Sequence, residues 1–512
     1  MSGLKAHFPV LLVVVPLLTA PLLALIRQKQ VARALALLSA LATAVIGWGL
    51  VIAAREQVEP LSYHLGGWPP PIGIEYVVSQ ASAFVVAIVS SIAALGLLLG
   101  TRETRKEVTE GQQHLYYAAY LLCLAGLLGM AITGDAFNVF VFLEISSLST
   151  YSLVAMGNRR RAFSAAFNYL ILGTIGGTFV LIGIGLLYQV TGTLNVQDIA
   201  HRVQELEDVA PDSHNLTLLV AFVFMIVGLG LKLAVFPLHQ WLPGAYAEAP
   251  AAVSAFLAGT ATKVIYFQLL RTTVVFFGAA HVFGALRFGT HVLMPLSIAG
   301  MFIGSIAAIY QPTLKRMLAY SSVGQVGYLT LALSFGTEAG VQAGLLHLGA
   351  HAVTKAGLFC VVAAIVAGVG SNRIQRLNGL GKRMPIVAFA FVLGGVGLIG
   401  VPGTSGFVSK WALLQAAFAS EHYLVAGLVL LSSLVAVVYV WRIVEVMYFQ
   451  APPVDEKTTH DNLAMVPALI LLGASVLFGL FPDQVVELAA DAAHQLFLEP
   501  GSLPPLPTGG HG

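Results

Sequence analysis

The sequence has very little charge: only 10% of its 512 residues are Asp, Glu, Lys or Arg, whereas 57% are hydrophobic. A soluble globular domain carries about 25% charged residues. This chain therefore has too few charges to cover a surface that faces water, and it predicts an all-α membrane protein with many spans. Its formal net charge of +2 gives no indication of binding to nucleic acid.

Cysteine is also scarce. The two cysteines, Cys123 and Cys360, fall in separate apolar runs without the spacing of a metal or redox motif, so we interpret both as small core residues. Nucleotide and flavin motifs are missing as well. The glycine cluster 394-GGVGLIG-400 lies within an apolar run, where it indicates close helix packing rather than a phosphate cradle. We therefore expect no cofactor, no bound metal and no catalytic redox residue in this chain.

Apolar runs of about 20 residues, the length that crosses a bilayer as a helix, recur along the chain. The sequence predicts fourteen spans, near residues 8–26, 32–53, 79–100, 115–133, 136–156, 164–190, 215–235, 251–275, 289–310, 317–335, 340–368, 385–418, 423–447 and 463–481. The first run ends in basic residues rather than in a small-residue cleavage site, so we keep it as a span. Breaks are predicted at Pro237 and at Pro402-Gly403.

Basic residues collect in every second connection between these spans. They are Arg27, Lys29, Arg33, Arg102, Arg105, Lys106, Arg159, Arg160, Arg161, Lys315, Arg316, Arg373, Arg376, Lys382, Arg383, Arg442 and Lys457. The positive-inside rule places these loops in the cytoplasm and both termini outside, in a bacterial or archaeal inner membrane. After the last span, residues 482–498 predict a short amphipathic helix at the outer surface, and GSLPPLPTGGHG predicts a disordered tail.

Once the basic residues assigned to loops and to the N-terminus are set aside, four lysines remain within predicted spans, and one acid lies deep in a span: Lys232, Lys263, Lys355, Lys410 and Glu144. Each charge at a bilayer centre costs about 2.5–3.5 kcal/mol on insertion scales. Packing alone does not justify that cost, so we expect these side chains to face the protein interior, water and one another. For a lysine near a helix end, such as Lys232, the plainer alternative is that the ammonium reaches the headgroups.

The predicted span 340–368 carries His347, His351 and Lys355 at intervals of four residues, which puts all three on one helix face. Two histidines at this spacing can bind zinc, but a lysine one turn further along repels a cation. A row of titratable groups one turn apart suits proton transfer instead. The alternative for both histidines is an ordinary core position with satisfied hydrogen bonds.

Glu144 and Lys232 form a candidate pair if their helices touch. Burial favours the neutral form of an amine, whereas a nearby carboxylate favours the charged form. A lysine held between these two influences can accept and release protons. Beyond the predicted break, His239 is a candidate proton inlet, although a plain interfacial role suits both His239 and Trp241.

The spans between residues 111 and 450 divide into two blocks of five, each with its fourth span broken. An odd number of spans inverts the second block, which is a transporter design. The predicted organisation is an N-terminal three-helix segment (1–110), a first inverted repeat (111–275), a second inverted repeat (276–450), and a last span with a short tail (451–512).

Several stretches together resemble a known family: 134-GDAFNVFVFLEISSLSTYSL-153, 236-FPLHQWLPGAYAEAPAAVSAFLAGTATKV-264, 315-KRMLAYSSVGQVGY-328 and 347-HLGAHAVTKAGLF-359. They look like the antiporter-like proton-conducting subunits shared by respiratory complex I, membrane-bound hydrogenases and Mrp-type cation/proton antiporters. The resemblance implies a proton half-channel in each inverted repeat. It also implies a relay through Glu144, Lys232, Lys263, a position in the span 340–368 at His351 or Lys355, and Lys410.

Within that family, Gly244-Ala245-Tyr246 resembles the D-type subunits of the Mrp antiporters, and Glu248-Ala249-Pro250 resembles the complex I form. We favour an Mrp D-like subunit that works with other membrane subunits and exchanges protons for Na⁺ or another monovalent cation. One alternative is an M- or N-like subunit of an NADH:quinone oxidoreductase-type translocase or a hydrogenase. The other is a stand-alone carrier of a small organic solute, which the lack of a substrate-sized polar cluster disfavours.

Overall fold

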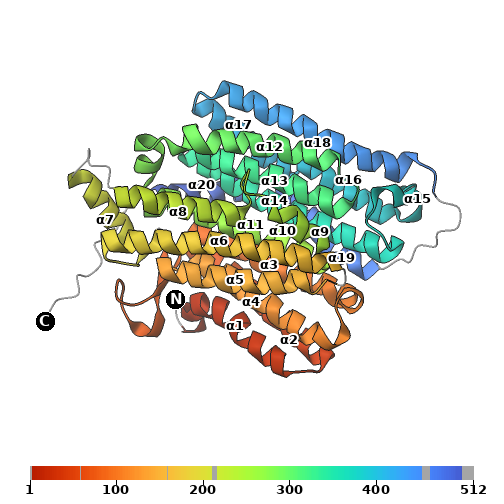
Figure 1. Ribbon diagram of the computed structural model, residues 1–512, viewed down its shortest axis with the longest axis horizontal. Coiled ribbons are helices and arrows are strands. Elements are labelled where there is room, and N and C mark those ends of the chain that lie inside the picture. The colour runs from red at the N-terminus through yellow and green to blue at the C-terminus, as the bar shows by residue number, and fades with distance from the viewer. Residues whose placement is uncertain (1–2, 58, 158–159, 210–215, 453–461, 499–512) are drawn as a thin grey trace.

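The computed structural model describes residues 3–57, 59–157, 160–209, 216–452 and 462–498, which form a bundle of long helices lying side by side (Figure 1). Helices are expected because the interior of a bilayer offers no water to backbone groups, and an α-helix satisfies them within the segment. The first half contains α1 (Phe8–Leu25), α2 (Lys29–Arg55), α3 (Gln80–Glu107), α4 (Gln113–Ile132), α5 (Ala136–Ala155), α6 (Arg160–Thr191), α7 (Val196–Val209), α8 (Leu216–Leu233), α9 (Trp241–Glu248), α10 (Ala251–Gly259) and α11 (Ala261–Arg271).

The second half begins with three short π-helical segments, Thr272–Phe276, Ala280–Ala285 and Gly289–Leu293. It continues with α12 (Met294–Ile309), α13 (Leu314–Ser334), α14 (Glu338–Val369), α15 (Leu380–Arg383), α16 (Pro385–Ile399), α17 (Ser405–Ala419), α18 (Tyr423–Phe449), α19 (Asn462–Leu480) and α20 (Asp483–Phe497). Helix α14 lies at the centre of this half, where it packs against α10, α13, α16, α17 and α19.

By length and apolar composition, 11 helices of the described residues can cross a membrane, or up to 12 if the bent pair α19–α20 is one span. These cover all the predicted spans except 317–335 and 385–418, which coincide with α13 and with the pair α16–α17. Almost every residue of α13 is buried, so its polar side chains face protein rather than lipid. The count of fourteen spans, the inverted repeats and the predicted domain limits remain predictions.

Both predicted breaks lie between helices. Helix α8 ends at Leu233 and α9 begins at Trp241, so Pro237 falls in the connection rather than in a helix. The chain leaves α8 at Ala234, whose φ of 64° lies in the left-handed region. Helix α16 ends at Ile399 and α17 begins at Ser405, with positive φ at Gly400 and Gly403. A third break, at Thr260 between α10 and α11, was not predicted.

A small hairpin, β1 (Leu61–His64) and β2 (Glu75–Val78), was also not predicted. The strands are antiparallel, with Leu61 opposite Val78 and His64 opposite Glu75. Isolated bridges join Tyr76 to Thr133 and Asp135 to Asn195, so the hairpin lies against the α4–α5 turn and the start of α7. The buried Glu75 carboxylate accepts hydrogen bonds from Ser62 and Asn195, which fastens this end of the bundle.

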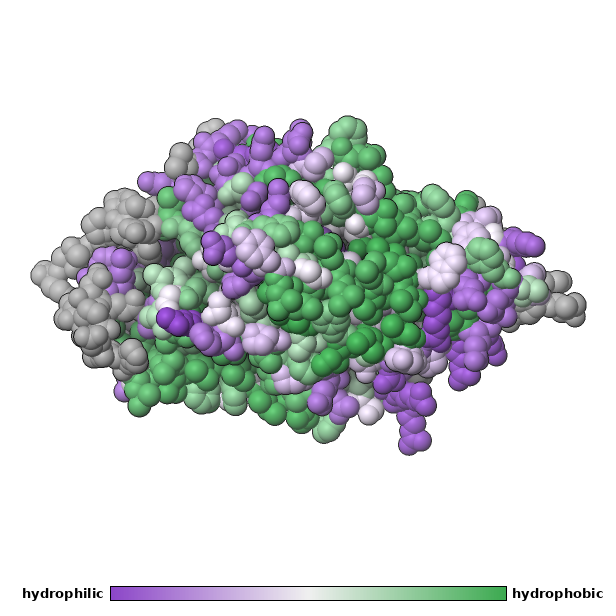
Figure 2. Space-filling model, turned by 90° about the horizontal axis from the view of Figure 1, so that it is seen from above, coloured by the Kyte–Doolittle hydropathy of each residue, from purple (hydrophilic) through white to green (hydrophobic). Residues whose placement is uncertain are grey.

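The surface agrees with a membrane setting. Hydrophobic residues cover the middle of the face shown in Figure 2, and hydrophilic ones gather at its right end and over its upper left part. Helix α15, with Lys382 and Arg383, lies toward that end in Figure 1, whereas α7, α20 and the start of α1 lie toward the other. The start of α1 and α20 thus share one end of the bundle, as an even number of spans requires. Which end faces the cytoplasm stays a prediction.

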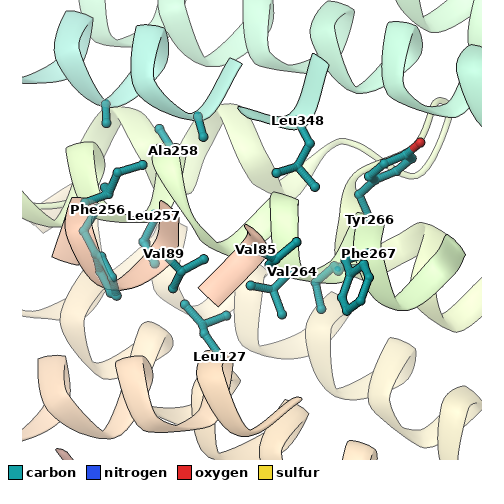
Figure 3. Close-up of a cluster of buried hydrophobic side chains, with 14 of the residues drawn as sticks. Val85, Val89, Leu127, Phe256, Leu257, Ala258, Val264, Tyr266, Phe267 and Leu348 are labelled. Atoms are coloured by element: carbon teal, nitrogen blue, oxygen red, sulfur yellow. The ribbon is translucent and has the colours of Figure 1, made fainter. Parts of the chain in front are cut away.

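The core around the α10–α11 break is made of closely packed aliphatic and aromatic side chains (Figure 3). Val85 and Val89 of α3 and Leu127 of α4 meet Phe256 and Val264. Within a bilayer, such contacts stabilise the bundle through packing rather than through the expulsion of water. Two smaller predictions are confirmed here: both cysteines are buried and free, and a Cβ at Gly394 would collide with Leu358.

The predicted helix after the last span is α20, which bends by 83° from the preceding helix. One of its faces is buried through Leu488, Ala489, Ala492 and Ala493. It packs against α14 and α3, so this helix is part of the bundle on one side. The predicted tail lies outside the described residues.

Candidate functional site

Glu144 of α5 and Lys232 of α8 lie in contact, with the lysine Nζ 3.3 Å from the carboxylate Oε1. The same ammonium donates to the hydroxyl oxygens of Ser147 at 2.6 Å and Tyr151 at 3.3 Å. These partners lie three and seven residues after Glu144, on the face of α5 that meets α8. The Lys232 side chain is 3% exposed. The lysine therefore does not reach the headgroups; its charge is held by protein groups.

Glycines of α6 make room for this pair. A Cβ at Gly177 would collide with Oε1 of Glu144, and one at Gly173 would collide with the Tyr151 hydroxyl. At Gly176, a Cβ would lie 3.1 Å from the backbone oxygen of Gly228, at the close crossing of α6 and α8. The glycines of 173-GTIGG-177 therefore leave the space in which carboxylate, ammonium and phenol meet.

Trp241, the first residue of α9, is buried rather than interfacial, so the interfacial interpretation of this residue is wrong. Its indole Nε1 donates to the backbone oxygen of Leu231 at 2.8 Å, and its ring stacks on Tyr169 with centroids 3.9 Å apart. The last turn of a helix leaves carbonyl oxygens without partners inside the helix. Trp241 satisfies one of them, directly beside Lys232, and so fixes the end of α8.

His239 lies half-buried in the connection between α8 and α9, stacked on Phe236 with ring centroids 5.5 Å apart. Its Nδ1 is buried without a hydrogen-bond partner among the described residues. Its role as a proton inlet remains a prediction.

Lys263 is fully buried, two residues into α11 and directly after the break at Thr260. Its ammonium donates to the backbone oxygen of Ala258, in the last turn of α10, and to the Thr262 hydroxyl at 3.3 Å. Carbonyl groups at a helix C-terminus carry partial negative charge and favour a nearby cation. The carbonyl oxygen at the end of α10 thus binds the Lys263 ammonium, as the Glu144 carboxylate binds the Lys232 ammonium.

Helix α14 carries His347, His351 and Lys355 in the predicted row. The two imidazole rings are nearly parallel, with centroids 6.1 Å apart. Nδ1 of His347 lies 3.0 Å from the Ser409 hydroxyl of α17, and neither ring nitrogen of His351 has a hydrogen-bond partner among the described residues. The Lys355 ammonium turns to α13, where it binds the backbone oxygen of Leu318 at 2.8 Å and the Ser321 hydroxyl.

Lys410 of α17 reaches back across the second break. Its ammonium donates to the backbone oxygens of Leu398 at 3.1 Å and Ile399 at 2.9 Å, the last two residues of α16. It also donates to the Ser433 hydroxyl at 3.0 Å and lies 4.7 Å from the centre of the Tyr328 ring. Lys263 and Lys410 therefore have the same kind of setting, an ammonium bound by the carbonyl end of the helix before a break.

The sequence-predicted residues fall into two groups. Glu144 and Lys232 form one, and the other group lies on helices that pack around α14: Lys263 on α11, His347, His351 and Lys355 on α14, and Lys410 on α17. Among the described residues, no hydrogen bond or ion pair joins Lys232 to Lys263. The described part of the chain also holds no group of three or more His, Cys, Asp or Glu residues that could bind a metal.

Sequence reasoning missed the hydroxyl partners Ser147, Tyr151, Ser409 and Ser433, and the Tyr328 ring beside the Lys410 ammonium. The sequence could have identified Ser147 and Tyr151, because they follow Glu144 at helical spacing and so share its helix face. The partners of Lys410 come from helices far apart in the chain, so spacing within one helix could not identify them.

Comparison with known proteins gives consistent matches along the chain. The model of the family described as NADH:quinone oxidoreductase/Mrp antiporter, transmembrane, matches residues 133–436. The N-type subunit of NADH-quinone oxidoreductase from Desulforudis audaxviator is 38% identical over 499 residues, covering 94% of this chain and 97% of that protein. The D-type subunit of the Na⁺/H⁺ antiporter from Bacillus subtilis is 29% identical over 500 residues, covering 96% and 97%.

A solved structure has the same fold. A chain of the Mrp complex from Dietzia superposes with a TM-score of 0.87 and 25% sequence identity, covering 97% of this chain and 98% of that one. The matched family region contains every predicted site residue from Glu144 to Lys410. The chain is a multi-pass membrane protein that belongs to the NADH:quinone oxidoreductase/Mrp antiporter family.

Proposed function

We propose that this chain translocates protons as a membrane subunit of a multisubunit Mrp-type monovalent cation/proton antiporter. The observation that carries the proposal is the ion pair between the buried Lys232 and the partly exposed Glu144, with an Nζ–Oε1 distance of 3.3 Å. An ion pair taken out of water costs several kcal/mol per ion and is weak evidence for a purely stabilising role. A pair whose members can exchange a proton, followed by three more buried lysines, is the arrangement that proton transfer requires.

The proposed relay starts at Glu144 and Lys232 and continues through Lys263 to the His347, His351 and Lys355 row, ending at Lys410. His239 is the proposed inlet. Each lysine binds hydroxyl or carbonyl oxygens that can hold the charged form. Arrival of a proton at one site raises the cost of charge at its neighbours, so the proton is passed on. No redox step takes place in this chain.

Partner subunits are part of the proposal because of Glu144. Its side chain is 23% exposed in the isolated chain, and a carboxylate open to lipid is costly. A neighbouring membrane subunit that covers this face of α5 removes that cost. We place the complex in a bacterial or archaeal inner membrane, with the basic loops in the cytoplasm and both termini outside.

A second candidate is the same proton-translocating role in a redox complex. The 38% identity to a protein named as an N-type subunit of NADH-quinone oxidoreductase favours it, whereas the proteins named as D-type antiporter subunits are 29% identical. The residues of the relay serve either complex, because only the energy source differs. A stand-alone solute carrier has no specific observation in its favour.

The deciding experiment uses everted vesicles from cells that make the complete complex, with a fluorescent reporter of the proton gradient. If the chain is an antiporter subunit, we expect added Na⁺ or K⁺ to dissipate an imposed proton gradient without any electron donor. If the chain is a subunit of a redox complex, we expect a proton gradient to form only when an electron donor such as NADH is oxidised. Identification of the copurifying subunits provides the independent check. Full cation exchange by vesicles holding this purified chain alone would contradict both.

A further inference from the structure

Three buried hydroxyl groups join α14, α19 and α17. Thr354 Oγ1 of α14 lies 3.2 Å from Ser475 Oγ of α19, which lies 2.7 Å from Ser405 Oγ at the start of α17. None of these residues is more than 4% exposed. A hydroxyl group both donates and accepts, so three in contact form a continuous row. Ser475 lies in a predicted apolar span that the relay described above does not use.

Close backbone packing holds the row in place. A Cβ at Gly479, one turn after Ser475, would collide with the backbone of Gly403 and Thr404 at the α16–α17 break. A Cβ at Gly397 would lie 3.2 Å from the Thr354 side chain. Helix α19 is therefore pressed against the break, and Ser475 has little freedom to move away from its two partners.

One end of the row lies at the relay. Thr354 follows His351 by three residues and so lies one turn along the same face of α14. At α17, Ser405 precedes Ser409 by four residues, and Ser409 is the hydrogen-bond partner of His347. Thr354 at one end of the row thus lies one helical turn from His351, and Ser405 at the other end lies one turn from Ser409; among the described residues, no hydrogen bond joins the row to either histidine.

The other neighbour of the row is a cavity of about 460 Å³ at the break. Gly403 and Gly479 line it, and its other lining residues are apolar except for Gln342 and Gln415. A water molecule occupies about 30 Å³ of liquid, so this cavity has room for several, with the two glutamines as its polar lining residues. Ser405 follows Gly403 by two residues, which places the end of the row next to the cavity wall.

We propose that Thr354, Ser475 and Ser405 form a hydroxyl branch that carries protons between the α14 histidines and the cavity at the α16–α17 break. In each passage a hydroxyl oxygen binds an incoming proton and releases its own proton to the next oxygen. Only O–H bonds form and break, and one proton moves in net. The hydroxyls then rotate back before the next passage. This proposal rests on the proposed proton-translocating function and makes α19 part of the path.

The test compares four variants in everted vesicles that contain the complete complex. Ser475→Ala and Thr354→Val remove one hydroxyl each with little change in shape, and Ser475→Thr keeps the hydroxyl. The matched control is Ser90→Ala, because Ser90 is also fully buried but bonds only to carbonyl oxygens of its own helix. Proton transport is measured in H₂O and in D₂O, and the amount of assembled complex is measured for every variant.

We expect Ser475→Ala and Thr354→Val to slow proton transport about tenfold, equivalent to about 1.4 kcal/mol, with normal assembly. Ser475→Thr restores the rate, and the solvent isotope effect grows in the slow variants because proton transfer then limits the rate. Rates equal to that of Ser90→Ala would overturn the branch, as would slowing that Ser475→Thr fails to restore or that leaves the isotope effect unchanged. Lys232→Ala is assayed in parallel: transport retained there overturns the proposed function itself, and the branch with it.

Discussion

Three of the four lysines in the proposed relay bind backbone carbonyl oxygens instead of a carboxylate: Lys263, Lys355 and Lys410. A carbonyl dipole stabilises an ammonium less strongly than a full negative charge does, because its charge is partial. These lysines can therefore lose a proton without leaving an unpaired buried carboxylate behind. Lys232 differs, since Glu144 remains beside it in either state. In the proposed relay we therefore expect the first pair to store a proton and the later lysines to transfer it.

The α6 glycines give a prediction at this scale. Gly177→Ala puts a methyl group where Oε1 of Glu144 lies, so the carboxylate must move away from Lys232. Overpacking of this kind costs about 1–3 kcal/mol, and we expect coupled proton transport in vesicles to fall on the order of tenfold. The control is Gly185→Ala on the same helix, where a Cβ meets nothing within 4 Å. Equal transport in the two variants would show that α6 does not position the pair.

At the scale of elements, the broken helices determine where the charges are. Helix α8 ends one residue after Lys232, α10 ends four residues before Lys263, and Lys410 reaches the last residues of α16. Each break exposes carbonyl oxygens that an unbroken helix would use internally. A break in the hydrophobic interior is tolerated where protein or water satisfies those groups, and here the lysines and Trp241 do so.

Trp241 provides the prediction for these elements. Trp241→Phe keeps most of the stacking on Tyr169 but removes the indole donor, so the Leu231 oxygen beside Lys232 loses its partner. An unsatisfied buried acceptor costs about 1–3 kcal/mol, and we expect a lower thermal unfolding midpoint for the purified complex and slower proton transport. Trp441→Phe, at an exposed tryptophan of α18, should leave both unchanged. If Trp241→Phe behaves like that control, α9 does not fix the end of α8.

The sequence predicted the helices well because lipid permits few alternatives to an apolar helix of about 20 residues. Pro237 and Pro402-Gly403 marked two breaks, since proline and glycine have known backbone effects. The break at Thr260 lacks a proline, and the hairpin strands of four residues are too short to give a pattern. Burial of Trp241 depends on Tyr169, a contact between separate helices, which periodicity within one segment does not contain.

On the scale of the whole molecule, the two groups of buried charges are surrounded by apolar side chains. The core in Figure 3 encloses the α10–α11 break, and hydrophobic residues cover the middle of the face shown in Figure 2. A low-dielectric surrounding strengthens interactions between charges, so we expect a proton added at one site to raise the free energy of the charged form at the next site. A partner subunit that covers the exposed edge of Glu144, as proposed above, would place this carboxylate in the same low-dielectric surrounding.

The central claim is that the Glu144–Lys232 pair carries the translocated proton. The most direct measurement is coupled proton transport in vesicles holding the complete complex with Lys232→Ala or Glu144→Ala, against Lys382→Ala at the basic end of the bundle as control. We predict that both relay variants assemble normally and lose coupled transport, while the control transports at the wild-type rate. Near-normal transport by either relay variant would contradict the account.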